Sequence, residues 1–466
     1  MKTLVAPDRL LDQGLARLRA RFAIPEAFPA EVVQAAERAA QRRPDRHADR
    51  TALPFVTLDP AASTDLDQAF AIEASGADRL LHYAIADVAW FVEDGDPLDQ
   101  EAWRRGTTTY LPDGKASLYP AALGEGAASL LPGVDRPAVI LTVRIDPAGE
   151  ARLEGVERAL IHSRAKLAYE TVRDEQLPEG FVEIARRIER AEDRRGAQRV
   201  DPPEQVVESD GKGGFTLGFR PQLLSERRNA ALSLAANLAV AQTMLEAGTG
   251  LFRVMALPDA KAEDRLRASA LALKLEWPPA MPLAQFQRRL DPGKPAEAAF
   301  MLAIRRTGSG AGYRPFDPHS EQWSELPWHA AVAAPYAHAT APLRRLADRY
   351  VLRTVLALAQ GQALPEAVGS ALPELPRVMA RAASRDSQID RAVIDLAEAA
   401  MLQGQEGTVF KAVVSDLRQD SAQVQFKEVP VIATVSAPDA LPGTTLSLRL
   451  LRADPLEGTL SFEVVD

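Results

Sequence analysis

Apolar positions at helical spacing mark the first 50 residues and predict two helices. Leu11, Leu15 and Leu18 repeat every three or four residues, and a break near Pro25 separates them from a second apolar stripe that starts near Pro29. Lys and Arg outnumber Asp and Glu in this segment. Two alternatives stay open: a helix-turn-helix that contacts phosphates, or a helical hairpin that packs on the main body with its charges in solvent.

From residue 51 to residue 403 the hydrophobic pattern mixes strands and helices. Apolar runs predict strands over 55–58, 82–86 and 138–143, and Ala/Leu-rich stretches predict helices over 229–247 and 340–360. After residue 404, short alternating runs separated by turns predict a small OB-type barrel. We therefore expect an α+β protein with a helical segment over 1–50, a mixed α/β domain over 51–403 and a β-barrel over 404–466.

Composition narrows the chemistry of this 466-residue chain. It contains no Cys and six His, which excludes disulfides and thiolate metal sites. Metal binding must then rest mainly on carboxylates, which favour hard cations such as Mg²⁺ or Mn²⁺. The net charge of −9 argues against a basic coat protein but not against an enzyme with a basic groove. We find no apolar run long enough to span a membrane and no signal-peptide pattern, so we expect a cytoplasmic protein.

The most informative stretch is a carboxylate cluster after the first predicted strand. Asp59, Asp65 and Asp67 fall within nine residues, and the last two share a face of an extended chain. Carboxylates held together repel unless cations lie between them. Two hard cations about 3.5–4 Å apart are a common device for phosphodiester cleavage. The alternative from the residues alone is an ordinary loop with capping Asp side chains.

A second cluster combines a helix start with arginines. Thr340 is a suitable N-cap and Pro342 suits a first turn, which predicts free N–H groups beside Arg344 and Arg345. A helix N-terminus next to Arg side chains is an anion site. The alternative is a structural helix with an Arg344–Asp348 ion pair.

A third element is Tyr110, which precedes Leu111-Pro112-Asp113 at the edge of a predicted turn. Its ring is placed to stack on a nucleic-acid base. The alternative is an ordinary half-buried tyrosine.

These clusters, in this order, resemble the ribonuclease II/R (RNB) family of 3′-to-5′ exoribonucleases. The family's carboxylate signature matches residues 57–59 and 64–68, and its VAIADV strand matches 83–88. Its YLPD and SLxPGxDRxA elements match 110–113 and 129–138, its HFTSPIRRYxD segment matches 338–348, and the opening of its C-terminal OB domain matches 407–415. The resemblance covers roughly residues 51–466, and these motifs occur in register.

The resemblance implies a magnesium-dependent hydrolase that degrades single-stranded RNA from its 3′ end to 5′-mononucleotides, with Mn²⁺ as a substitute cation. It also implies a variant without the family's N-terminal cold-shock domains. Neither a membrane nor an obligatory protein partner is indicated. It assigns catalytic roles to Asp59, Asp65, Asp67 and Arg344. The expected metal ligands are Asp59, Asp65, Asp67 and Gln68. The expected RNA-binding residues are Tyr110, His338, Thr340, Arg345 and Tyr313.

The chain departs from the family pattern at two places near the expected metals. Gln68 stands where the family's signature ends in Asp, and Ala230 and Ala231 lie where paired Glu are usual. An amide oxygen still ligates a hard cation but contributes no charge. Two functions therefore stay open: an active exoribonuclease, or a degenerate member that binds RNA or another partner with weak or no nuclease activity.

Overall fold

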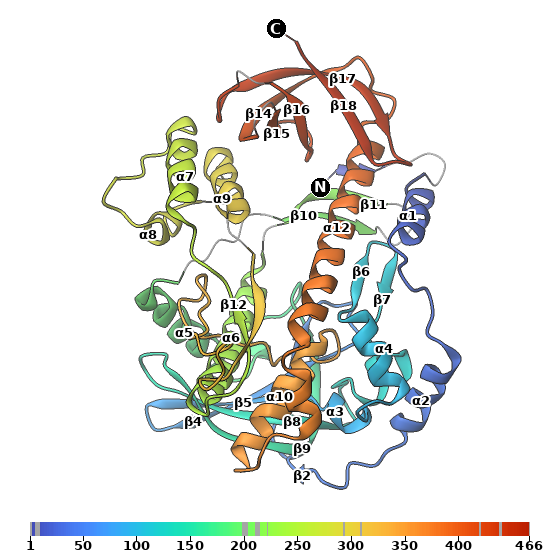
Figure 1. The fold of residues 1–466 in the computed structure, drawn as a ribbon, viewed down its shortest axis with the longest axis vertical. Helices are drawn as coiled ribbons and strands as arrows, with labels where there is room; N and C mark the ends of the chain where they lie inside the picture. Colours follow the sequence, from blue (N-terminus) through green and yellow to red (C-terminus); the bar gives the residue numbers. More distant parts are fainter. Residues whose placement is uncertain are drawn as a thin grey trace.

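The computed structural model describes residues 2–4, 10–197, 204–209, 215–220, 222–291, 294–307, 310–418, 421–437 and 440–465. Figure 1 shows a mixed sheet with its helices at one end of the molecule and a β-barrel at the other. The long helix α12 (Leu375–Leu402) runs between them. This arrangement confirms the expected α+β class.

The central sheet places the carboxylate loop. Its strands follow the order β2-β9-β3-β4-β5-β8, and β8 also pairs with β9. Apolar and β-branched side chains bury β3 almost completely, which fixes its register beside β9. The strands are β2 (Ala48–Asp49), β3 (Phe55–Asp59), β4 (Gln68–Ser75), β5 (Asp78–Ala86), β8 (Asp135–Ile145) and β9 (Ala151–Ala168).

Helices cover the sheet and form one continuous core with it. The Ala/Leu-rich α6 (Leu224–Glu246) packs against β8, β9 and the neighbouring α5 and α10. The elements that complete this body are α3 (Val88–Phe91), α4 (Pro97–Arg105), the hairpin β6 (Thr109–Leu111) and β7 (Gly114–Ala116), the π-helix η1 (Leu123–Ala127), the 3₁₀-helix η2 (Asp174–Gln176), α5 (Phe181–Arg195), α10 (Leu346–Ala359) and α11 (Glu366–Ala371).

A smaller helical unit projects beside this body in Figure 1. It has its own core around Trp277, whose ring stacks on Phe286 with 5.3 Å between centroids. Its elements are α7 (Ala260–Ala272), α8 (Leu283–Gln287) and α9 (Pro295–Thr307), and the two-stranded sheet of β12 (Gly250–Val254) and β13 (Gly312–Phe316) connects it to the main body.

The N-terminal segment contains the two predicted helices, but they pack on different parts of the molecule. In α1 (Leu10–Arg21), Leu11, Leu15 and Leu18 bury against α12 and the strand β11 (Phe215–Arg220). In contrast, α2 (Ala30–Ala40) packs against α4, α3 and η1. The structure thus shows two separately docked helices, which corrects the expectation of one helix-turn-helix or hairpin module. Their apolar stripes are used by different cores.

A three-stranded sheet of β1 (Lys2–Leu4), β11 (Phe215–Arg220) and β10 (Glu204–Ser209) also borders α12. The first of these strands lies where the sequence indicates a helical segment. The buried carboxylate of Glu398, on α12, connects three elements: it accepts hydrogen bonds from Gln205 Nε2 at 2.6 Å and from the backbone N–H of Ile432 at 2.8 Å. Gln205 lies on β10 and Ile432 begins a strand of the barrel.

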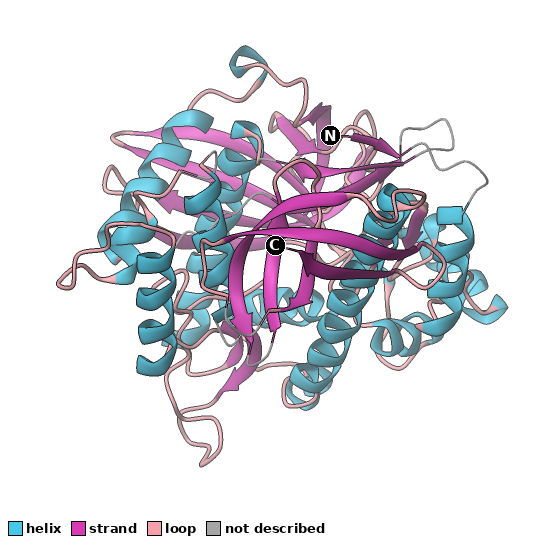
Figure 2. Cartoon of the chain, turned by 90° about the horizontal axis from the view of Figure 1, so that it is seen from above, coloured by secondary structure: helices cyan, strands magenta, loops and turns pink. Residues whose placement is uncertain are grey.

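The C-terminal barrel agrees with the short strands predicted from the alternating pattern. Its sheet has the order β16-β15-β14-β17-β18, and the edge strands β16 and β18 lie against each other, so the barrel is nearly closed. Figure 2 shows these strands from above, across the middle of the view. They are β14 (Val409–Arg418), β15 (Ser421–Phe426), β16 (Ile432–Ser436), β17 (Thr445–Asp454) and β18 (Thr459–Val465). None of the described helices is long and apolar enough to cross a membrane.

Candidate active site

The three predicted carboxylates lie at the end of β3 and on the loop that follows it. Two distant residues hold this loop. Ser129 Oγ accepts from the backbone N–H of Leu66 at 2.9 Å and donates to the carbonyl of Thr64 at 2.7 Å. Lys166 Nζ donates to the carbonyl of Ala61 at 2.7 Å. The loop conformation therefore depends on contacts more than 60 residues away in the sequence.

Asp67 joins this loop to the second cluster. One carboxylate oxygen accepts from the backbone N–H of Leu343 at 2.7 Å, and the other lies 3.3 Å from Nε of Arg344. Asp67 is 4% exposed. Burial raises the pKa of Asp67 to about 7, although Arg344 favours the charged form. The side chain of Arg344 is 44% exposed, so its guanidinium is both oriented by Asp67 and accessible from solvent.

Asp65 is held by the hairpin of β6 and β7. Tyr110 and Lys115 are cross-strand neighbours in this hairpin, so their side chains leave the same face. Lys115 Nζ lies 2.8 Å from Asp65 and 3.1 Å from Glu125, and the Tyr110 hydroxyl lies 3.4 Å from Asp65. Tyr110 remains 51% exposed. An accessible aromatic ring therefore lies beside an expected catalytic carboxylate.

Asp59 ends β3 and differs from the other two carboxylates. Its Oδ2 atom is buried and has no hydrogen-bond partner among the described residues. Burial raises the pKa of Asp59 to about 6, against the opposing charges of Arg344 and Lys166. A buried carboxylate oxygen without a partner is unusual and fits a site that a cation or a substrate group completes.

Gln68 opens β4 and is bound by the protein itself. The hydroxyl of Tyr83, a fully buried residue of β5, donates to Gln68 Oε1. The amide oxygen expected to face a metal therefore already has a donor.

These contacts partly fit a hard cation. The unpartnered oxygen of Asp59 is a suitable ligand for Mg²⁺. Within the described ranges, however, no three His, Cys, Asp or Glu side chains are close enough together to hold a metal. Asp65 and Asp67 are paired with Lys115 and Arg344 instead. Metal binding by the four expected ligands stays a prediction.

The second cluster is a loop where the sequence indicated a helix start. The helix α10 begins at Leu346, and Thr340 is not its N-cap. Thr340 Oγ1 lies 3.0 Å from Ser233 Oγ and 3.4 Å from Asn237 Nδ2, both on α6. The backbone N–H of Leu343 is directed at Asp67. The prediction of a free helix N-terminus at this point is wrong, because tertiary partners take the polar groups that a first turn would expose.

The remaining expected RNA-binding side chains, Arg345, His338 and Tyr313, have partners within the protein. Arg345 forms an ion pair with Asp348 at 2.8 Å. The sequence-based alternative of a pair between Arg344 and Asp348 is therefore wrong, since Arg344 pairs with Asp67. His338 Nδ1 and the Tyr313 hydroxyl are 2.9 Å apart. Burial lowers the pKa of His338 well below its usual value, so the ring is neutral. Contact of these residues with RNA stays a prediction.

Sequence reasoning missed Lys115, Tyr83 and Asn229. Lys115 was readable, because it follows the turn at Pro112-Asp113-Gly114 and therefore faces Tyr110. Tyr83 and Asn229 carried no such signal. Asn229 donates to the Tyr169 hydroxyl at 2.8 Å beside the end of β3, and only the folded structure places α6 there.

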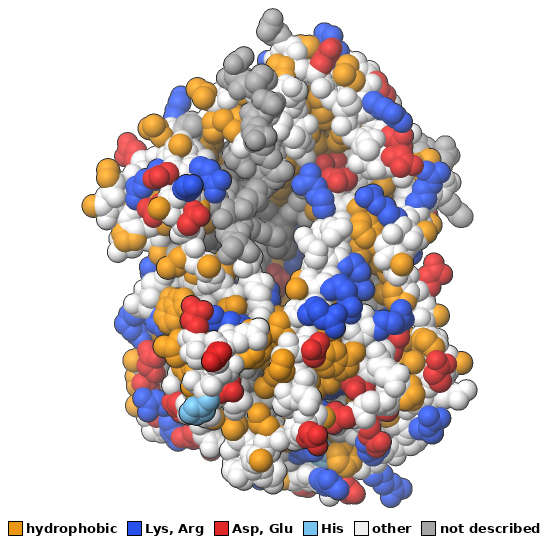
Figure 3. Space-filling model, viewed as in Figure 1, with side chains coloured by type: hydrophobic (Ala, Val, Ile, Leu, Met, Phe, Trp, Pro, Cys, Tyr) orange, Lys and Arg blue, Asp and Glu red, His pale blue; other side chains and the backbone are white. Residues whose placement is uncertain are grey.

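Basic side chains gather on one face of the molecule. Figure 3 shows Lys and Arg side chains grouped in the region of α12 and α4. Exposed guanidinium groups of these two helices include Arg104, Arg377 and Arg391, whose side chains are 58%, 77% and 55% exposed and are paired with Glu101, Glu374 and Asp395. We call these exposed side chains the basic surface near α12; neighbouring carboxylates neutralise part of it, and its exposed guanidinium groups suit a phosphate backbone.

Comparison with known proteins adds a family to this geometry. A model of the RNB domain matches residues 47–361, and a model of the RNase II-type exonuclease C-terminal S1 domain matches residues 408–465. The fold and site thus define a protein with an RNB domain followed by an S1 domain. Because the first match spans more than half of the chain, the protein belongs to the RNB family.

Named relatives agree with this result at moderate identity. Ribonuclease R of Thermotoga maritima is 25% identical, with 95% of this chain and 69% of the relative covered. Ribonuclease R 1 of Lactococcus lactis is 24% identical, with 97% of this chain and 61% of the relative covered. The chain therefore spans about two thirds of the length of these relatives.

Solved structures show the same fold at lower identity. Mycoplasma genitalium RNase R in complex with ribose methylated single-stranded RNA superposes with a TM-score of 0.85 at 19% identity, covering 98% of this chain and 78% of that one. Yeast Ssd1, described as a pseudonuclease, superposes with a TM-score of 0.68 at 17% identity, covering 96% and 57%. The fold therefore occurs with and without nuclease activity, and activity must be argued from the site residues.

Proposed function

We propose that the protein is a hydrolytic exoribonuclease that degrades single-stranded RNA processively from its 3′ end to 5′-mononucleotides, and that it requires Mg²⁺ or Mn²⁺. The observation that carries the proposal is the convergence of Asp67, the N–H of Leu343 and the accessible guanidinium of Arg344. The polarity of degradation and the product come from the family resemblance. A role in RNA decay in the cytoplasm follows from the same proposal.

In this proposal Arg344 binds the scissile phosphate. Asp67 fixes its Nε, so the remaining guanidinium N–H groups keep one orientation. A planar guanidinium matches phosphate oxygens in a bidentate geometry. Because the group is oriented before the substrate arrives, it stabilises the charge that develops on the phosphate at little reorganisation cost.

Tyr110 orients the end of the RNA. Its half-exposed ring lies next to Asp65, and base–aromatic stacking contributes about 1–3 kcal/mol per base without sequence preference. Lys115, paired with Asp65, neutralises that carboxylate when no other cation does. These contacts favour a substrate of any sequence whose terminal base is unpaired.

The cation would be held by Asp59, with Asp65 and Asp67 as the nearest further carboxylates in the sequence. When bound, it supplies Lewis-acid stabilisation of the phosphate and a nucleophilic water at neutral pH. The buried, unpartnered Oδ2 of Asp59 supports this part of the proposal.

An assay with a labelled single-stranded oligoribonucleotide tests the proposal. Two versions of one oligoribonucleotide of about 20 nucleotides, labelled at the 3′ end or at the 5′ end, are incubated with the full chain in Mg²⁺, in Mn²⁺ and in EDTA. We expect rapid release of labelled mononucleotide from the 3′-labelled RNA, conversion of the 5′-labelled RNA to a short end product without accumulated intermediates, and neither in EDTA. RNA that is bound in an anisotropy measurement but stays intact with both metals would instead identify a degenerate, RNA-binding member of the family.

A further inference from the structure

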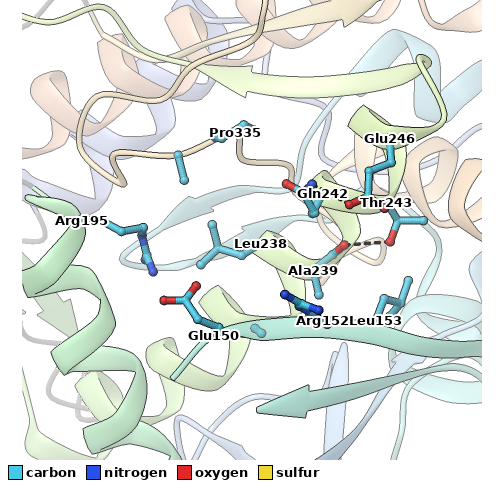
Figure 4. A pocket seen from close by; sticks show the side chains of 12 residues that line it. Glu150, Arg152, Leu153, Arg195, Leu238, Ala239, Gln242, Thr243, Glu246 and Pro335 are labelled. Carbon is cyan, nitrogen blue, oxygen red and sulfur yellow. Dashed lines mark hydrogen bonds between the residues drawn. The ribbon is translucent and has the colours of Figure 1, made fainter. Parts of the chain in front are cut away.

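A pocket of about 570 Å³ opens on the face of α6 that the candidate active site does not use. It is bordered by the second half of α6, the start of β9, the end of α5 and the loop at Pro335. Figure 4 shows Arg195 at one end, Gln242, Thr243 and Glu246 at the other, and Leu238 between them. A cavity of this size is typical of small-ligand sites. We call it the α6–β9 pocket.

The Arg195 end of the pocket has hydrogen-bond donors that no described residue uses. Two nitrogens of Arg195, Nε and Nη2, are buried without a hydrogen-bond partner among the described residues. Arg152 lines the same pocket, is exposed, and forms no ion pair in the described part of the chain. The nearby carboxylate of Glu150 lies 3.6 Å from Arg194 and also acts electrostatically on Arg195. The buried guanidinium N–H groups of Arg195, which have no hydrogen-bond partner, favour an anion in the adjoining space.

The other end of the pocket offers acceptors and an amide. Gln242 Nε2 donates to Glu246 Oε1 at 2.7 Å, which leaves the second carboxylate oxygen of Glu246 for a ligand. Thr243 Oγ1 donates to the carbonyl of Ala239 at 3.0 Å, so its oxygen is available as an acceptor. Between the two ends lie the apolar side chains of Leu238 and Pro335. The lining thus suits a ligand with an anionic end, a flat apolar body and donors at the far end.

We propose that the α6–β9 pocket binds a nucleoside 5′-monophosphate. Arg195 contacts the phosphate, the base lies along Leu238, and hydroxyl or amino groups donate to Glu246. Inorganic phosphate would use one end of the pocket only, and a nucleoside would leave Arg195 without its anion. This binding does not require hydrolysis, although the proposed reaction releases a product of the same chemistry.

The pocket is distinct from the candidate active site. The two sites share α6, whose Ser233 and Asn237 contact Thr340 in the loop that precedes α10. Leu238 and Gln242 project from the same helix into the pocket. A change at Arg195 is therefore not expected to alter contacts of the carboxylate loop, which permits separate tests of the two sites.

Isothermal titration of the full chain with AMP in EDTA tests the proposal. We expect saturable binding by the parent and by Asp67→Asn, and binding at least about tenfold weaker in Arg195→Gln, because one charge-assisted contact is lost. The matched control is Arg186→Gln, which removes an exposed charge from the same helix α5 and should bind AMP as the parent does. Inorganic phosphate and adenosine, titrated separately, should each bind at least about tenfold more weakly than AMP.

Four results of these titrations would overturn the proposal, and a fifth comes from the additional variant below. These are no AMP binding by the parent, unchanged affinity in Arg195→Gln, loss of binding in Asp67→Asn, or equal affinity for inorganic phosphate and AMP. A gain-of-affinity variant guards against a folding defect in Arg195→Gln. Glu150 is exposed and faces the arginine end, so Glu150→Gln should fold normally and bind AMP several-fold more tightly. Unchanged affinity in Glu150→Gln would place the phosphate elsewhere.

Discussion

Replacing Asp67 by Asn keeps the size of the side chain and removes its charge. The carboxylate accepts from Leu343 N–H with one oxygen and from Arg344 Nε with the other. An amide has one acceptor oxygen only, so its NH₂ group must face one of these two donors. The variant therefore loses one hydrogen bond and the ionic orientation of Arg344.

The size of the effect follows from these contacts. A hydrogen bond between charged groups contributes about 1.5–3 kcal/mol, which corresponds to roughly 10- to 150-fold in rate if it acts in the transition state. Loss of negative charge near the proposed cation adds to this factor. We expect kcat to fall at least about 100-fold, while the Kd for single-stranded RNA changes less than about threefold because the basic surface near α12 is intact.

Single-turnover cleavage of a labelled oligoribonucleotide measures the first quantity, and fluorescence anisotropy in EDTA measures the second. Asp94→Asn is the matched control, because Asp94 also pairs with an arginine, Arg353, but lies outside the site. Cleavage by Asp67→Asn within tenfold of the parent rate would refute the catalytic assignment. A large fall in the control would show that any lost Asp–Arg pair impairs the enzyme.

The remaining predictions concern four residues. Arg344→Ala should lower kcat about 100-fold or more with little change in KM; an effect on KM alone would make Arg344 a binding contact. Tyr110→Ala should end digestion at longer products, because short RNA dissociates before the last cuts, and an unchanged product ladder would contradict stacking. Gln68→Asp should reach half-maximal rate at a several-fold lower Mg²⁺ concentration than the parent, whereas superimposable titrations would show that residue 68 takes no part in metal binding. Burial raises the pKa of Glu398 from 4.5 to about 7, so between these pH values the folded protein retains a proton that the unfolded chain releases, and the free energy of unfolding falls as pH rises. In urea unfolding, Glu398→Gln should therefore be up to about 3 kcal/mol more stable than the parent at pH 8 and almost equal to it at pH 4. A stability difference that does not change with pH would contradict this prediction.

Local patterns predicted elements whose stability is local. The apolar run of β3 and the alternating strands of the barrel lie close to the expected positions. A strand buried on both faces needs a continuous apolar run, and a half-buried strand needs an apolar residue at every second position, so the sequence pattern alone indicates both. The helix at Thr340 failed for the opposite reason. Its capping signal is real, but Ser233 and Asn237 take the hydroxyl, and Asp67 takes the N–H of Leu343 from 276 residues away.

The N-terminal helices and the site partners show the same limit. The periodicity of Leu11, Leu15 and Leu18 predicts a buried stripe but does not state that α12 covers it. Likewise, Lys115 is readable as the neighbour of Tyr110 across a turn, whereas the contact of Tyr83 with Gln68 requires the register of β4 and β5. The sequence therefore identifies the candidate carboxylates, but their contacts depend on residues that are far away in the sequence and close only in the folded structure.

Each of the three carboxylates at the end of β3 and in the loop after it has its own surroundings. Lys115 forms an ion pair with Asp65. Asp67 binds Arg344 and the backbone N–H of Leu343. Burial raises the pKa of Asp59 to about 6. Each device reduces the repulsion that would otherwise separate these groups. In the proposed function an RNA phosphate would compete for Arg344 and Lys115, which would leave the negative charges of Asp67 and Asp65 without these partners. The affinity of the loop for a cation should then rise when RNA is present, and because linkage is reciprocal the cation should tighten RNA binding by the same factor.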